Sequence, residues 1–153
     1  MRTLAETFYR WVLVLWIGGH CTVGYLVAPL LFTGLGDRQL AGLVAGRFFA
    51  LIGWIGLAGG AYLLLFLIAR WRASAWKRSV FWLTLTLLML VAVGQFGIQP
   101  LMAQFKADAL PRDVMDIALR DRFVLWHGLS QVVYGIETLL GLWLAAWMDR
   151  GLR

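Results

Sequence analysis

A few polar side chains with ligand or hydrogen-bonding chemistry lie inside long apolar runs of this sequence. Two pairs of them are spaced four residues apart, so each pair shares one face of a helix. In apolar surroundings each of these groups needs a partner on another helix or in a bound ligand. We predict one polar intramembrane site formed by His20, Gln95, Gln99, His127, Gln131 and Glu137.

Two histidines and the single cysteine are candidate metal ligands: His20, Cys21 and His127. Neutral imidazole is the commonest transition-metal ligand, and Cys21 could add a soft donor. At 1.5 Å per helical residue, the two histidines would differ in depth by about 12 Å, which argues against their binding one ion. Haem or metal ligation is therefore the lesser alternative here.

Glu137 is the acidic residue deepest in an apolar run. An unpaired carboxylate at that depth costs several kcal/mol, so Glu137 is protonated, paired with His20 or an arginine, or in contact with a water-filled cavity. A proton or cation site with His20 is one interpretation. Hydrogen bonds that only hold helices together are the other.

No catalytic motif accompanies these residues. The sequence contains no glycine-rich phosphate loop, no GxSxG and no pair of carboxylates on one helix face within the apolar runs. This pattern favours a protein that is not an enzyme.

The composition predicts an integral membrane protein in a lipid bilayer. The 153 residues are 61% hydrophobic and 14% charged, with a mean hydropathy of +0.77, whereas soluble proteins have about 45–50% apolar and about 25% charged residues. The net charge of +6 comes from short basic clusters beside apolar runs. Because these clusters build no basic face, we expect no nucleic-acid partner.

Four apolar runs are long enough to cross a bilayer as helices. The first, FYRWVLVLWIGGHCTVGYLVAPLLF, is followed by a polar turn at residues 34–42. Pro100 is expected to end the third helix, because proline lacks an N–H and its ring clashes with the preceding turn. The predicted spans of this single transmembrane domain, residues 1–153, are residues 8–32, 46–69, 79–99 and 123–148.

The predicted fold is all-α, a membrane four-helix bundle. Pro111 suits the first turn of a helix, and Val114, Ile117 and Ala118 keep a helical rhythm with Phe123. We therefore expect an amphipathic helical extension before the fourth span.

The distribution of basic residues predicts an N-in/C-in orientation. The N-terminus, the loop RWRASAWKR and the C-terminus together hold eight Lys and Arg, against six on the other side. Since basic residues in short loops set topology, both termini are expected in the cytoplasm. The expected location is a bacterial inner (cytoplasmic) membrane, crossed several times.

Glycines and one proline are expected to shape the bundle. A stripe of Gly46, Gly53, Gly56 and Gly60 on the second span would let another helix backbone approach closely. Pro29 predicts a kink in the first span. This kink would widen one end of the bundle into a small polar vestibule beside His127 and Gln131.

The stretch GHCTVGYLVAPLLFTGLGDRQLAGLVAGRFF, with Ala28–Pro29, Leu31–Phe32 and Ala41–Gly42, resembles the family called domain of unknown function 4149. That family includes eukaryotic transmembrane protein 205. FVLWHGLSQVVYGIETLLGL is similar to its last span, and the resemblance implies a four-span bundle without established catalytic residues. A histidine beside tryptophan and glycine in the first span is also similar to copper-resistance D proteins and bacterial membrane protoporphyrinogen oxidase.

Three functions remain open from the sequence. The first is a membrane protein that binds or conducts a proton, a metal ion or a small solute at the buried polar site. The second is a structural or assembly partner, as a homo-oligomer or within a membrane complex. The third is a haem- or copper-binding membrane protein.

Overall fold

The structure is a computed structural model that describes residues 3–109 and 117–152, all of which lie in helices or short connections without a strand. In three of its helical segments α-helical turns are joined to π-helical or 3-10 turns. The elements are α1 (Leu4–Thr22), η1 (Val23–Val27), α2 (Ala28–Gly34), α3 (Arg38–Trp71), η2 (Arg72–Lys77), α4 (Ser79–Val93), η3 (Gly94–Ile98), α5 (Gln99–Ala109), α6 (Ile117–Ala146) and η4 (Met148–Gly151).

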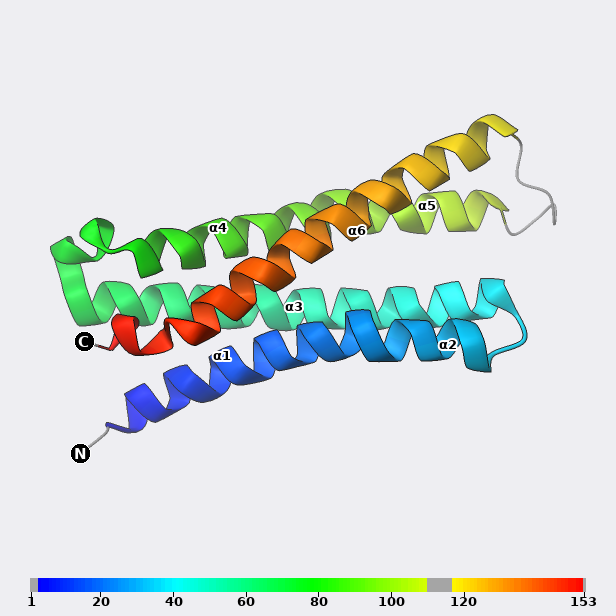
Figure 1. Cartoon of the computed structure of the whole chain (residues 1–153). Helices are drawn as coiled ribbons and strands as arrows, with labels where there is room; N and C mark the ends of the chain where they lie inside the picture. The colour runs from blue at the N-terminus through cyan, green and yellow to red at the C-terminus, as the bar shows by residue number, and fades with distance from the viewer. Residues whose placement is uncertain (1–2, 110–116, 153) are drawn as a thin grey trace.

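Four segments are long and apolar enough to cross a membrane: Leu4–Gly34, Arg38–Lys77, Ser79–Phe105 and Asp121–Ala146. They run side by side, with α6 oblique to the other helices and in contact with α1, α4 and α5 (Figure 1). Both chain ends lie with η2 at one end of the bundle, which we call the terminal end. The opposite end, which holds the connection between α2 and α3, is the loop end. The chain is thus an all-helical, multi-pass membrane protein.

The second helical segment begins earlier than the sequence predicted. Residues 34–42 were expected to be a polar turn, but α3 starts at Arg38. Asp37 is its N-cap, since one carboxylate oxygen accepts hydrogen bonds from the N–H groups of Gln39 (2.7 Å) and Leu40 (3.2 Å). Such a cap satisfies donors that the first helical turn leaves unpaired.

The prediction that Pro100 ends the third helix is wrong. The segment continues as α5 to Ala109, and Pro100 is its second residue, directly after the π-helical turn η3. Pro29 likewise follows η1 as the second residue of α2. Proline leaves one carbonyl of the preceding turn without its usual N–H, and a wider π-turn moves the hydrogen-bond register there. The structure thus has a π-turn shortly before Pro29, while the kink expected at Pro29 itself stays a prediction.

The terminal half of the bundle is closely packed around Trp16, which is 1% exposed. A methyl group placed on Gly56 would collide with the Trp16 ring, one on Gly60 would be tightly pressed against it, and one on Gly59 would touch the same side chain. The glycine face of α3 therefore admits a large indole side chain, whereas the sequence suggested the approach of a backbone. Trp16 shares this core with Tyr9, Leu13, Ile17, Leu63, Leu67, Val80, Leu87, Val91 and Leu144.

The expected amphipathic extension lies partly outside the described residues. The helix α6 begins at Ile117, before the predicted entrance of the fourth span at Phe123. Pro111 and Val114 belong to the residues that are not described. The amphipathic character of the extension stays a prediction.

Adding a methyl group at Gly56 tests the fit of Trp16. In Gly56→Ala the new Cβ would lie 2.7 Å from the indole nitrogen of a rigid, buried ring. We expect a loss of about 1–3 kcal/mol in the free energy of unfolding, as for other overpacked cores. In the control Gly18→Ala the new Cβ meets no atom within 4 Å, so stability should stay the same or rise by up to about 1 kcal/mol through the higher helix propensity of alanine. Thermal unfolding in detergent, followed by circular dichroism, measures both; equal stabilities would contradict the packing role.

Candidate functional site

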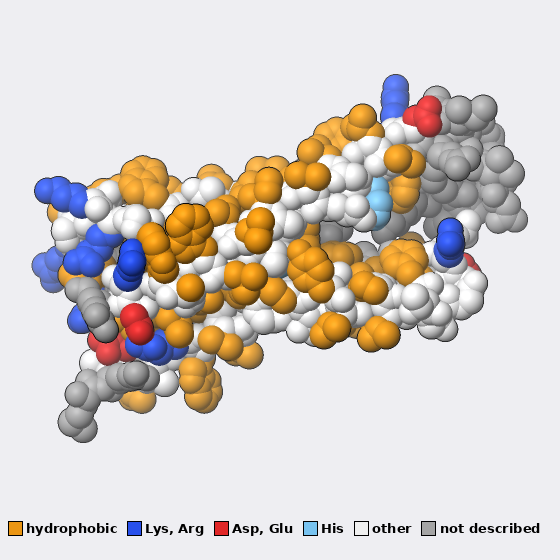
Figure 2. Space-filling view, in the orientation of Figure 1, with side chains coloured by type: hydrophobic (Ala, Val, Ile, Leu, Met, Phe, Trp, Pro, Cys, Tyr) orange, Lys and Arg blue, Asp and Glu red, His pale blue; other side chains and the backbone are white. Residues whose placement is uncertain are grey.

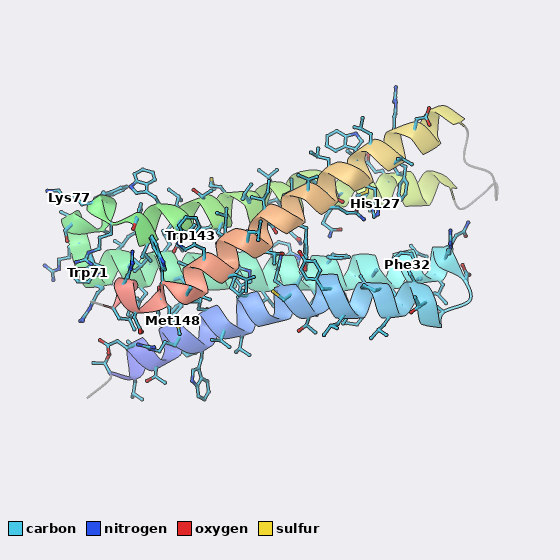
Figure 3. The ribbon with its side chains drawn as sticks, viewed as in Figure 1. Phe32, Trp71, Lys77, His127, Trp143 and Met148 are labelled. Atoms are coloured by element: carbon cyan, nitrogen blue, oxygen red, sulfur yellow. The ribbon has the colours of Figure 1, made fainter. Side chains whose placement is uncertain are left out.

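A cavity of about 750 Å³ occupies the half of the bundle toward the loop end. Side chains from all four membrane segments line it. The surface is hollowed between α6 and α2 (Figure 2), and His127 and Phe32 line the two sides of this hollow (Figure 3). A vestibule was predicted at this end of the bundle.

The polar residues singled out in the sequence come together here. The lining includes His20, Gln95, Gln99, His127, Gln131 and Glu137. Cys21 is not among the lining residues; it is half-buried and packs against the hydrophobic core. The site also contains Arg38, Gln39, Tyr25, Ser130 and Tyr134, which the sequence reasoning did not single out.

His20 is held against α6 by Tyr134. Its Nε2 lies 3.4 Å from the Tyr134 carbonyl oxygen, to which it donates, and the two rings stack with centroids 3.8 Å apart. The Tyr134 hydroxyl donates in return to the His20 carbonyl oxygen at 2.6 Å. Because the contact is reciprocal, it fixes α1 to α6 directly before the π-turn η1.

A second hydroxyl contact extends this link. Tyr25 Oη donates to Thr138 Oγ1 at 3.1 Å, and Thr138 Oγ1 donates to the Tyr134 carbonyl at 2.8 Å. Gly24 makes room for the arrangement, because a methyl group there would overlap the Tyr134 ring. The absence of a side chain at Gly24 is therefore needed for the α1–α6 contact.

Glu137 lies deep in the cavity and is 7% exposed. Its Oε2 is 4.0 Å from His20 Nε2, beyond ordinary hydrogen-bond length. Among the described residues, no Lys or Arg forms an ion pair with it and no donor forms a hydrogen bond with it. The carboxyl group thus keeps its capacity for a partner in the cavity.

Gln95 is a second buried polar group on the cavity wall, 9% exposed. Its amide rests against Gly53 of α3, where any side chain would collide with the amide oxygen. The side-chain amide has no hydrogen bond to a described residue. Gly53 therefore serves to admit Gln95, on the face where backbone packing was predicted.

His127 and Gln131 lie nearer the open side and are exposed. The side-chain nitrogen of Gln131 is 3.2 Å from His127 Nε2, and the imidazole stacks on Phe123 with centroids 5.6 Å apart. This pair keeps the i, i+4 relation that the sequence indicated, and it gives the cavity a polar rim.

The candidate metal ligands are not assembled as a metal site. Among the side chains that the structure describes, no three His, Cys, Asp or Glu lie together as a metal ion would need. His20 uses Nε2 toward Tyr134, and Cys21 lies outside the cavity lining. Within the described side chains, His20, Cys21 and His127 therefore do not form a three-ligand metal site.

Comparison with known proteins finds one family. The sequence model of the family described as "Domain of unknown function (DUF4149)" matches residues 11–110. No curated protein and no solved structure matches the chain. The matched part includes His20 and Gln95, while His127, Tyr134 and Glu137 on α6 lie beyond it.

Removing the Tyr134 hydroxyl should loosen the link between α1 and α6. In Tyr134→Phe, the His20 carbonyl loses a 2.6 Å hydrogen bond, and we expect the free energy of unfolding to fall by about 1 kcal/mol. The control Tyr62→Phe removes a hydroxyl without a hydrogen bond to any described residue and should leave stability unchanged. Thermal unfolding in detergent compares them; a Tyr134→Phe protein as stable as the wild type would refute the link.

Proposed function

We infer the function of this chain, which belongs to the DUF4149 family, from the geometry of its cavity. We propose that it is a non-enzymatic membrane protein that binds a small organic solute in the cavity between its four helices. The observation that carries this proposal is the gathering of six in-span polar side chains from three membrane segments around one cavity.

The size of the cavity favours a small organic solute over a proton or a bare metal ion. Pockets for small molecules have volumes of about 300–1,000 Å³ and apolar walls with a few polar groups. The cavity of about 750 Å³ falls in this range, and apolar residues such as Phe49, Ile52 and Val91 separate its polar groups. A proton or metal ion needs no such volume.

The assembly role is the alternative, and the geometry of His20 favours it for that residue. His20 has its ring stacked on Tyr134 and its Nε2 directed at a backbone carbonyl, which are interactions between helices. Glu137 and Gln95 make no such hydrogen bonds within the described part of the chain. In this alternative the protein would be a homo-oligomer or a partner in a membrane complex.

For location, we propose a bacterial inner membrane with both termini in the cytoplasm. Lys and Arg side chains gather at the terminal end on the face seen in Figure 2. Short basic loops stay on the cytoplasmic side, and η2 with its neighbours is such a loop. A relationship to eukaryotic transmembrane protein 205 is proposed from the motifs in residues 19–49 and from the similarity of residues 123–142 to the last span of that family.

Filling the cavity tests the binding proposal. Ala28 lines the cavity, whereas Ala58 is exposed on α3 outside it. We expect at least one of three probes of similar shape, tetraphenylphosphonium, triphenylphosphine oxide and tetraphenylborate, to bind the purified protein saturably. Ala28→Phe should weaken that binding at least tenfold because the new ring takes up cavity space, and Ala58→Phe should not. Equilibrium binding of radiolabelled probes measures this; no saturable binding, or equal effects of the two variants, would refute the proposal.

Thiol labelling tests the orientation. In a Cys21→Ser background, Gly36→Cys and Ala73→Cys each place one exposed thiol in the connection at the loop end or in η2. With cytoplasmic termini, a membrane-impermeant maleimide should label Gly36→Cys in intact spheroplasts and Ala73→Cys only after permeabilisation. The reverse pattern would show the opposite orientation.

A further inference from the structure

We propose that the ligand is a lipophilic organic cation, whose positive charge lies beside Glu137 and whose apolar body contacts the aromatic walls of the cavity. This inference rests on the proposed function, since it names the chemical class of the solute in the same cavity.

The first argument is the isolation of the Glu137 carboxyl group. It is 7% exposed, and its nearest cationic candidate is His20 Nε2 at 4.0 Å. His20 already directs that nitrogen to the Tyr134 carbonyl. An ionised carboxylate without a full counter-charge is unfavourable in an apolar medium, so a cation beside Glu137 would favour its ionised form by supplying the counter-charge that the described residues lack.

The second argument is the aromatic part of the cavity lining. Trp16, Tyr25, Phe49 and Tyr134 all line the cavity that also contains Glu137. The Phe49 ring meets Tyr134 edge to face, with centroids 5.2 Å apart and planes at 89°. The faces of aromatic rings attract cations, most strongly when the cation has shed its water. A cavity with both a buried carboxyl group and aromatic rings in its lining therefore suits a cation of diffuse charge and apolar surface.

Arg38, the only Lys or Arg among the described residues of the cavity lining, does not reverse this preference. Arg38 is exposed at the first position of α3. It lies fifteen residues before Gly53, which contacts the buried Gln95 amide on the cavity wall. At 1.5 Å per residue this separation is about 22 Å along the helix. An exposed guanidinium is solvated, so the buried Glu137 decides which charge the deep part of the cavity prefers.

The shape of the cavity also indicates how such a ligand would enter. The surface is hollowed between α6 and α2, on the side of two segments that are apolar enough to face lipid (Figure 2). Exposed apolar side chains surround this region of α2 and α6, among them Leu30 and Val124. A cation that partitions into the bilayer could therefore reach the cavity from the side.

Three probes of similar shape and different charge test the ligand class. Binding of tetraphenylphosphonium, uncharged triphenylphosphine oxide and tetraphenylborate is measured on the full chain in detergent. We expect the wild type to bind the cation at least tenfold more tightly than the anion. Glu137→Gln should lower the affinity for the cation at least tenfold and leave the affinity for the uncharged probe unchanged, because only the charge is removed. The control Glu6→Gln lies at the terminal end, outside the cavity, and should change neither of these two affinities.

The outcomes separate this inference from the proposed function. The uncharged or the anionic probe could bind the wild type more tightly than the cation does, with this binding weakened in Ala28→Phe. In that case the ligand class is wrong and the proposed function stands. If no probe binds the wild type saturably, both fail. Glu137→Asp keeps the charge and should still bind the cation more tightly than the other two probes. If Glu137→Gln does not fold, the order of affinities for the three probes, measured on the wild type and on Glu137→Asp, still tests the ligand class. A cation affinity unchanged in a folded Glu137→Gln protein would overturn the inference.

Discussion

The structure depends on one constraint: inside a bilayer no water is available as a hydrogen-bond partner for a polar group. His20 meets this constraint through α6, where Tyr134 supplies a carbonyl acceptor, a stacked ring and a hydroxyl donor. The link joins the first and last membrane segments at the level where η1 begins. This polar contact therefore helps to position α6 beside the cavity, together with the apolar packing of Leu144 in the core.

Packing and opening are divided between the two halves of the bundle. In the terminal half, Trp16 fills the space that Gly56, Gly59 and Gly60 leave free. In the other half, two π-turns, each followed by a proline, lie on α1–α2 and α4–α5, and residues of both turns line the cavity. Helices that change their hydrogen-bond register at this level cannot pack as regularly as those in the terminal half. π-turns are frequent at functional sites.

The sequence predicted which segments are membrane helices better than it predicted the residues at which those helices begin and end. Apolar runs locate all four membrane segments because length and hydropathy are set by the bilayer. Pro100 was misleading, since the rule that proline ends a helix ignores a π-turn that lets the helix continue. Asp37 was a readable N-cap signal for α3 that was overlooked. Polar residues in apolar runs were conspicuous and do line one cavity, but Tyr25 and Tyr134 were not, because aromatic residues are common in membrane helices and their hydroxyl partners depend on the fold.

The contrast between His20 and Glu137 carries the functional argument furthest. A bundle shaped by packing alone gains nothing from a buried carboxyl group, since replacing buried ionic groups by apolar ones of similar size is often neutral or stabilising. His20 offsets its burial with two interactions to Tyr134, whereas Glu137 has neither a hydrogen bond nor a basic partner other than His20 at 4.0 Å among the described residues. A cation beside Glu137 would supply the counter-charge that the described residues lack. Glu137 is therefore the residue from which we argue the chemical preference of the cavity.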